Sequence, residues 1–315
     1  HITTWKNTQN TFQTNMDNNF SSYDCLECDG NNATKPYNNC DNPYNGTVQC
    51  DKPKGYATGT TGTLNVYLAV PGAGNTWEKS NVQATYVTVV DGKIYDMIPG
   101  LTYYWELDSD PNVYGTVTVS GTRRIVDGGD IRNIRDLGGM EVDVDGDGTP
   151  DGTLKYGILF RGPKLNTAAD VQALRTLGVT EEVDLRGNTA GNKLTENYQP
   201  REIVNYEIDK ANYPTNYAQF KQALTDTMTD VKNGEKIYFH CAIGTDRTGT
   251  MAWFLEGLLG VSEEDRLEDY ELSYFYGLLN RHRFYSTQQG TTITHRFTYM
   301  YNLYDTNTKI YNYYT

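Results

Sequence analysis

A cysteine and an arginine six positions apart, with a glycine between them, are the residues of this chain best suited to chemistry. They lie in the run His240-Cys241-Ala242-Ile243-Gly244-Thr245-Asp246-Arg247-Thr248-Gly249. Backbone N–H groups in such a loop can surround an anion, and a guanidinium adds a planar fork for two phosphate oxygens. The same positive field favours thiolate over thiol, which would make Cys241 a nucleophile at neutral pH.

Two predicted elements flank this loop. Residues 236–239 include the apolar run Ile237-Tyr238-Phe239 and predict a short buried strand, while the mostly apolar residues 251–259 predict a helix. The loop therefore joins a strand to a helix, where the positive end of the helix also attracts anions. Further strands are predicted at 154–160, 182–185 and 202–208, and helices at 167–177 and 216–231. This alternation predicts an α/β domain over residues 122–315, with a largely parallel sheet flanked by helices.

The residues before this domain differ in pattern. Residues 1–55 are rich in asparagine and contain four cysteines, so we expect mainly loops there. Residues 56–121 show alternating strands at 63–70, 82–90 and 93–97, with an Asp-Gly turn before the third, which predicts a small all-β module. The segments 98–107 and 115–119 resemble an immunoglobulin or fibronectin type III sandwich.

The cysteines bear on the compartment. Cys25, Cys28, Cys40 and Cys50 lie close together, and Cys241 stands alone in the rest of the chain. Two disulfides in a secreted or extracytoplasmic protein are the favoured interpretation, with three pairings open. A four-cysteine zinc site is the alternative, although only one Cys-x-x-Cys pair is present.

Charge and hydropathy exclude other classes of protein. The net charge of −13, without a basic run, argues against a nucleic-acid partner. No stretch has the roughly 20 apolar residues of a membrane span. A phosphate-binding loop at 240–249, the phosphate loop, would still need positive charge nearby. Seven upstream cations could supply this charge, although we expect most of them to be solvated. The candidates are Arg123, Arg124, Arg132, Arg135, Arg161, Lys164 and Arg186.

The loop carries the Cys-x5-Arg signature and resembles that of the protein tyrosine phosphatase superfamily. Four further segments, in the same order, resemble a bacterial branch of tyrosine phosphatases with secreted tyrosine and lipid phosphatases among its members. They are Asn133-Ile-Arg-Asp-Leu-Gly-Gly139, Leu159-Phe-Arg-Gly162, Val183-Asp-Leu-Arg186 and Asp269-Tyr-Glu-Leu-Ser273. A looser resemblance links the loop to cysteine-type phytases.

The resemblance implies a phosphomonoester hydrolase that forms a phosphocysteine at Cys241 and needs no catalytic cofactor. Arg247 and the backbone of Ala242, Ile243, Gly244 and Thr245 would bind the phosphate, and Arg186 is a further candidate for substrate contact. Thr248 would assist the departure of the sulfur, and His240 would brace the loop or serve only as a buried histidine.

Two aspartates compete for the role of general acid. Asp246 is preferred, because the resemblance places the proton carrier just before the loop arginine. Asp209 is the alternative, as the aspartate of a separate loop. Arg135 and Asp136 are expected to support the structure, by pairing with each other or with the loop.

A protein tyrosine or dual-specificity phosphatase, acting on a phosphorylated protein or a small phosphomonoester, is the preferred function. An inositol phosphate or phosphoinositide phosphatase is the alternative. Relatives that act on phosphoinositides often have lysine between the loop glycine and aspartate, where this chain has Thr245. The resemblance therefore weakens the lipid alternative.

A second motif predicts structural calcium. Asp143, Asp145, Asp147 and Asp151 occupy positions one, three, five and nine of a calcium loop, with Gly148 at six and the carbonyl of Thr149 at seven. Position twelve is Leu154 rather than glutamate, which indicates a weak site. A solvated acidic turn is the plain alternative. A calcium-dependent surface binding protein with an incidental phosphatase-like domain is the alternative of another class.

Overall fold

The computed structural model describes residues 26–28, 50–53, 55–126, 131, 133–186, 201–202 and 213–273. The first strands, β1 (Leu26–Cys28) and β2 (Cys50–Pro53), pair antiparallel, and their register sets Cys28 opposite Cys50. The side chains of Cys25, Cys28, Cys40 and Cys50 lie outside the described residues, so the disulfide and zinc interpretations stay predictions.

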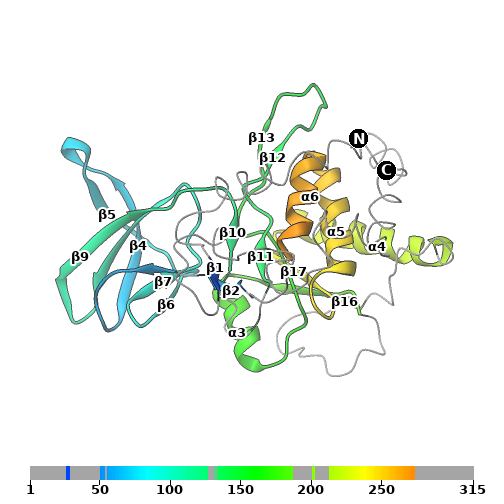
Figure 1. Ribbon diagram of the computed structural model, residues 1–315. Coiled ribbons are helices and arrows are strands. Elements are labelled where there is room, and N and C mark those ends of the chain that lie inside the picture. The colour runs from blue at the N-terminus through cyan, green and yellow to red at the C-terminus, as the bar shows by residue number, and fades with distance from the viewer. Residues whose placement is uncertain are drawn as a thin grey trace.

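Residues 56–118 form two antiparallel sheets (Figure 1). One has the order β5-β4-β8-β9 and the other β3-β7-β6. Their bounds are β3 Tyr56–Ala57, β4 Leu64–Pro71, β5 Trp77–Gln83, β6 Thr88–Val90, β7 Lys93–Tyr95, β8 Thr102–Leu107 and β9 Asp110–Thr118, with a short 3-10 turn, η1 (Ala73–Asn75), between β4 and β5. The two sheets share a core of buried apolar side chains that includes Val66, Ile94 and Tyr103.

The strand predicted at 82–90 is wrong as one element. The chain turns between β5 and β6, where the N–H of Val87 donates to the carbonyl of Ala84. Both residues are buried in the core of the module. Because they are apolar, Ala84 and Val87 continue the strand pattern in the sequence, but they belong to a turn that enters the core.

The second part of the structure has a mixed sheet of order β10-β11-β14-β17-β15-β16. Its strands are β10 Arg124–Ile125, β11 Arg135–Asp136, β14 Leu159–Gly162, β15 Glu181–Asp184, β16 Arg201–Glu202 and β17 Ile237–His240. The pairings among β14, β17, β15 and β16 are parallel, and those of β10 with β11 and of β11 with β14 are antiparallel. The sheet is therefore parallel from β14 to β16 and antiparallel at the edge formed by β10 and β11.

Helices cover both faces of this sheet (Figure 1). They are α3 Ala168–Thr176, α4 Tyr213–Lys232, α5 Asp246–Leu258 and α6 Glu263–Leu272. Phe160 and Tyr238 of the sheet share a core with Leu174 of α3. Leu159, Ile237 and Phe239 point to the other face and share a core with Leu224 of α4 and Phe254 of α5.

The strand predicted at 154–160 begins too early. Gly157 has φ +77° and forms a turn, so the strand starts only at Leu159. Before this turn, β13 (Gly152–Thr153) pairs with β12 (Glu141–Val142) to make a hairpin that extends away from the sheet (Figure 1). None of the helices in the described ranges combines the length and apolarity needed to cross a membrane.

Candidate active site

The loop that joins β17 to α5 is held close to the end of β14. Gly244 has φ +73°, and a Cβ at this position would lie 2.4 Å from the carbonyl carbon of Gly162 and 2.7 Å from the nitrogen of Pro163. Both the backbone conformation and the lack of space require glycine. The loop backbone is therefore packed against the carboxyl end of a neighbouring parallel strand, where ligand sites of such sheets lie.

Cys241 directly follows β17 and is 2% exposed. Burial alone would raise the pKa of its thiol. The adjacent hydroxyl and N–H of Thr248, the charge of Arg247 and the N–H of Ile243 outweigh burial, and the pKa lies below its ordinary value. The loop thus favours the nucleophilic form of the sulfur.

Two arginines lie beside this loop. Arg247, in the first turn of α5, donates from Nη1 to the carbonyl of Leu185 at 3.2 Å. The next residue after Leu185, Arg186, binds Asp184 through Nε and Nη2 at 2.7 to 3.1 Å. This hydrogen bond raises the pKa of Arg186 and, against the effect of burial, lowers that of Asp184. A thiolate at Cys241 also raises the pKa of Arg186, so this guanidinium acts electrostatically on the sulfur.

The loop carbonyls are bound on their outer side by side chains from two other segments. Arg161 of β14 donates from Nη2 to the carbonyl of Gly244 at 3.0 Å. The Nδ2 of Asn133 lies 3.3 Å from the carbonyl oxygen of Ile243 and 3.4 Å from that of Gly244. These donors fix the direction of two carbonyls, and with them the successive peptide groups whose N–H groups an anion-binding loop would use.

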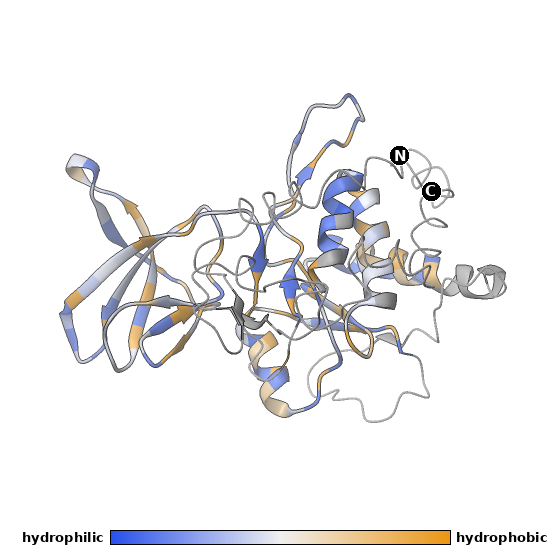
Figure 2. Cartoon of the chain, in the orientation of Figure 1, coloured by the Kyte–Doolittle hydropathy of each residue, from blue (hydrophilic) through white to orange (hydrophobic). Residues whose placement is uncertain are grey.

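Asp269 of α6 positions both of these donors. It binds Arg161 directly and reaches Asn133 through Arg135. Its carboxylate binds Arg135 Nε at 2.7 Å and Arg161 Nη1, and Arg135 donates to Asn133 Oδ1 at 2.6 Å. Burial would raise the pKa of Asp269, but the two arginines and the more distant Arg123 lower it far below its ordinary value. The loop thus depends on a charge network that ends in a helix (α6) whose residues are mostly hydrophilic (Figure 2).

Arg135 and Asp136 were expected to pair with each other or with the loop, and the structure supports the second alternative for Arg135, through Asn133. Asp136 instead binds Arg124 at 2.8 Å and accepts from the N–H groups of Gly138 and Gly157. Neighbours in a strand point to opposite faces, so Arg135 and Asp136 cannot share one partner. Arg135 supports the loop, while Asp136 supports the turn before β14.

The expectation that most upstream cations are solvated is also wrong, because five of the six described ones are buried. Their exposed fractions are 0 to 6% for Arg123, Arg124, Arg135, Arg161 and Arg186. Each forms an ion pair with a carboxylate, which is the usual condition for burying a charge. Arg132 lies outside the described residues, and Lys164 is exposed.

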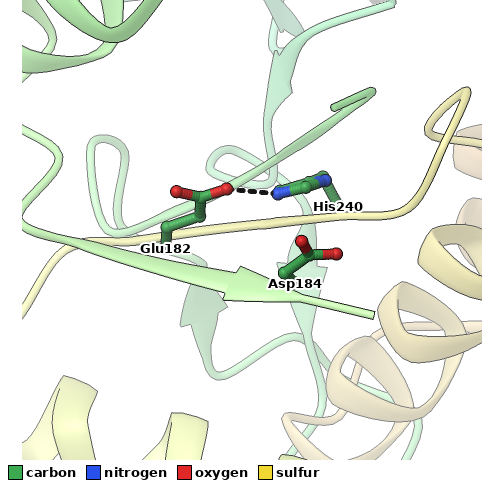
Figure 3. Close-up of side chains that lie close together, drawn as sticks. All are labelled: Glu182, Asp184 and His240. Carbon is green, nitrogen blue, oxygen red and sulfur yellow. Dashed lines mark hydrogen bonds and ion pairs between the residues drawn. The ribbon is translucent and has the colours of Figure 1, made fainter. Parts of the chain in front are cut away.

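His240 makes contacts on the opposite side of the sheet from α5. Its Nδ1 lies 3.0 Å from the carbonyl oxygen of Cys241, and its Nε2 lies 2.5 Å from Oε1 of Glu182. Glu182 and Asp184 extend from the same face of β15 toward this ring (Figure 3). Glu182 was not among the predicted site residues. The signal in the sequence was an acidic residue at a position of a predicted buried strand, two residues before Asp184.

The other predicted loop residues fall into three groups. Ala242 and Ile243 are exposed at the loop surface, and Ile243 is 44% exposed. Thr245 and Thr248 are buried. The two candidates for the general acid are not placed: Asp246 begins α5, but its side chain lies outside the described residues, as does the whole of Asp209.

The acidic loop of the β12–β13 hairpin brings together three of its four predicted aspartate ligands. Carboxylate oxygens of Asp143, Asp145 and Asp151 lie within 4.8 Å of one another. Asp147 is not in this group, and its Oδ1 instead accepts the N–H of Thr149 at 2.7 Å. Asp143 accepts N–H groups from three residues of the loop, Gly146, Asp147 and Gly148. These carboxylates are satisfied by the backbone of their own loop.

Comparisons with known proteins give one family. The model of the tyrosine phosphatase family matches residues 127–312, which is more than half of the chain. A Cupriavidus necator protein that is provisionally named a tyrosine-protein phosphatase is 28% identical over 171 residues, or 44% of this chain. The match spans 59% of that relative's length.

Two crystal structures of P. aeruginosa TpbA also match. One is 18% identical, with a TM-score of 0.32, over 44% of this chain and 86% of TpbA. The other, of a cysteine-to-serine variant of TpbA in complex with pTyr, is 19% identical with the same TM-score, over 47% of this chain and 90% of TpbA.

Proposed function

Because the chain belongs to the tyrosine phosphatase family, we propose that it hydrolyses phosphomonoesters with Cys241 as the nucleophile. The observation that carries this proposal is the placement of Cys241 directly after β17 and of Arg247 in the first turn of α5, on a loop whose surroundings also lower the pKa of the thiol. A buried cysteine without function would have its pKa raised by an apolar environment. Here the loop supplies hydrogen bonds and charge that favour the thiolate.

The first step is the transfer of the phosphoryl group to sulfur. The thiolate of Cys241 attacks phosphorus, so that an S–P bond forms while the bond from phosphorus to the leaving oxygen breaks. Arg247 and the loop N–H groups stabilise the charge on the three equatorial oxygens. Asp246 or Asp209 gives a proton to the departing oxygen.

The second step releases phosphate. Water attacks phosphorus, a new P–O bond forms, the S–P bond breaks and the electron pair returns to sulfur. The same aspartate accepts a proton from the attacking water. Thr248 stabilises the returning thiolate, because its hydroxyl and N–H lie close enough to Cys241 to favour the charged form of the sulfur.

Phosphotyrosine in a protein is the proposed substrate. Thr245 is fully buried, with its hydroxyl 3.4 Å from the carbonyl of Ile243, so this position brings no cation to the loop surface. The exposed side chain of Ile243 offers apolar contact instead. An aromatic leaving group fits such a surface better than an inositol phosphate with several charges.

A panel of substrates tests this function. The purified protein would be given a phosphotyrosine peptide, a phosphoserine peptide, inositol hexakisphosphate and phosphoinositide vesicles, and phosphate release would be measured. We expect turnover with the phosphotyrosine peptide to exceed the rest by at least about tenfold, a difference of about 1.4 kcal/mol. Faster release from an inositol phosphate would replace the substrate assignment, and no release from any substrate would contradict the function.

Two further properties stay predictions. Calcium binding by the acidic loop is supported by the proximity of Asp143, Asp145 and Asp151, and a surface-binding protein that depends on calcium remains the alternative of another class. Export from the cytoplasm is supported by the cysteines of residues 1–55. Mass spectrometry of the protein secreted into an oxidising compartment, with and without reduction, would detect disulfides or free thiols.

A further inference from the structure

We propose that Glu182 is a positioning residue, which keeps a proton on His240 and thereby favours the thiolate of Cys241. The inference rests on the proposed function, because it concerns the same nucleophile. It adds a residue that lies on β15, outside the loop, and that touches neither the phosphate site nor the sulfur directly.

The hydrogen bonds of His240 determine where its protons are. Nδ1 faces the carbonyl oxygen of Cys241 at 3.0 Å, and a carbonyl only accepts, so Nδ1 carries hydrogen. Nε2 faces Oε1 of Glu182 at 2.5 Å, and two unprotonated atoms cannot approach so closely. A second proton therefore lies between the ring and the carboxyl group. In the ion-paired form, both ring nitrogens are donors and the ring is positively charged.

Burial strengthens this pairing. The side chain of His240 is 0% exposed and that of Glu182 is 3% exposed. The second oxygen of Glu182, Oε2, has no hydrogen-bond partner among the described residues. The ring is thus the described hydrogen-bond partner of this carboxylate, while Arg186 acts on it only electrostatically. A charge-assisted hydrogen bond in a buried site is stronger than one at the surface.

The other charged and titratable groups on this face do not replace Glu182. Asp184 also extends toward the ring, with a carboxylate oxygen within 4.8 Å of a ring nitrogen, but both of its oxygens accept from Arg186. Tyr238 stacks on the imidazole with ring centroids 5.5 Å apart, and burial raises the pKa of its phenol, so that it stays neutral. Asp170 of α3 accepts the N–H groups of Asn166 and Thr167.

The positively charged ring is hydrogen-bonded to the backbone of the nucleophile. Its Nδ1–H donates to the carbonyl of the residue that carries the sulfur, so the charge of the ring adds to the field that favours the thiolate. Glutamine at position 182 can donate from its amide to the Nε2 of a neutral imidazole. The ring would then keep its place and lose its charge.

The test is the substitution Glu182→Gln, with Glu181→Gln as the matched control. Glu181 is also a buried glutamate of β15, but it points to the other face of the sheet. The rate of Cys241 alkylation by iodoacetamide would be measured against pH in each folded protein. We expect the midpoint to rise by about one pH unit in Glu182→Gln and to stay within about 0.3 unit of wild type in the control.

A double-mutant cycle tests whether the effect passes through His240. In a His240→Asn background, Glu182→Gln should produce no further shift. An unchanged or lowered midpoint in Glu182→Gln, or the same shift without the histidine, would overturn the proposal. Alkylation requires no phosphatase turnover, so a wild-type protein without activity would contradict the proposed function and leave this measurement intact.

A measurement on the wild-type protein covers the case in which Glu182→Gln does not fold. The ¹⁵N shifts of the His240 ring at pH 7 should place both nitrogens in the protonated range. A ring with one unprotonated nitrogen at that pH would contradict the inference.

Discussion

The phosphate loop at 240–249 and the acidic loop at 143–151 both gather polar groups, but they are held in opposite ways. The phosphate loop is fixed by side chains from β14 and β15, which lie far away in the sequence, and by α6, which acts through Arg161 of β14. The acidic loop is exposed at the end of a hairpin and satisfies its carboxylates with its own backbone N–H groups. One loop therefore depends on the whole fold for its geometry, and the other depends mainly on its local sequence.

This difference predicts how far the effect of a substitution spreads. A change at the phosphate loop or its partners should alter both chemistry and stability, because buried charges lose their compensation. A change in the acidic loop should stay local, because water can replace each lost contact. Substitutions at the phosphate loop and its partners should therefore have larger effects than changes in the acidic loop.

Cys241→Ser should abolish turnover. A serine hydroxyl at this position is a far weaker nucleophile than the thiolate that the loop favours. Binding of the substrate should persist, because Arg247 and the loop N–H groups remain. Phosphate release and substrate binding by calorimetry would be measured on the same preparation. Retained turnover would show that the sulfur is not the nucleophile.

Substitution of the general acid should remove the alkaline limb of the pH–rate profile. An acid must be protonated to act, so turnover falls as the pH rises through its pKa, and replacing it removes that limb. Asp246→Asn should flatten the alkaline limb and lower kcat by about 10²-fold or more, while Asp209→Asn should retain the limb. The reverse result would assign the role to Asp209.

In both aspartate variants, the acidic limb of the pH–rate profile should follow the titration of the nucleophile, Cys241. The pKa of Cys241 is lowered, so the thiolate persists below the usual thiol range and is lost only as the pH falls through this depressed value. Kinetic profiles of kcat/KM for wild type and both aspartate variants would be compared. An acidic limb that moves with either aspartate would contradict this assignment.

Asp269→Asn should destabilise the fold by about 3 to 5 kcal/mol, because two buried arginines lose the charge of their shared partner. Its pKa is depressed in the folded state, so this stabilisation is present above about pH 4 and is lost as the pH falls further. Urea unfolding at pH 7 and at pH 3 would measure the difference between wild type and variant.

The control for this experiment is Asp265→Asn, also on α6. Asp265 lies 3.6 Å from Arg123 and its side chain is 33% exposed, so we expect a loss of about 1 kcal/mol or less. Equal effects of the two substitutions would mean that the charge network does not hold the phosphate loop.

Calcium should have the smallest effect. If the acidic loop binds the ion, calcium in excess over the Kd should raise the free energy of unfolding by about 1 to 3 kcal/mol, and Asp145→Asn should remove this gain. Turnover should be the same with calcium and with a chelator, because the loop is exposed and satisfied locally. A melting temperature unchanged by calcium would remove the site.

The same contrast explains what the sequence could predict. The loop between β17 and α5 was predictable, because the apolar strand, the Cys-x5-Arg spacing and the following helix are all local patterns. Helices α3 and α4 were also found within a few residues of their observed bounds. The acidic loop was predictable for the same reason, apart from the orientation of Asp147.

The partners of the phosphate loop were not predictable to the same degree. Asp269 binds residues more than a hundred positions away, and no local pattern specifies that Arg135 turns to Asp269 while Asp136 turns to Arg124. Glu182 is paired with His240 only because β15 and β17 are adjacent and parallel. Such pairings follow from tertiary packing, which also buries arginines that look solvated in the sequence.

The near-complete burial of Cys241 makes its surroundings a size filter for reagents. Only 2% of the residue is exposed, which hinders the alignment of a protein disulfide with the sulfur far more than that of a small phosphoryl group or hydrogen peroxide. In the part of the chain described by the structure, Cys241 is a free thiol. The proposed nucleophile would thereby be shielded from exchange with larger disulfides.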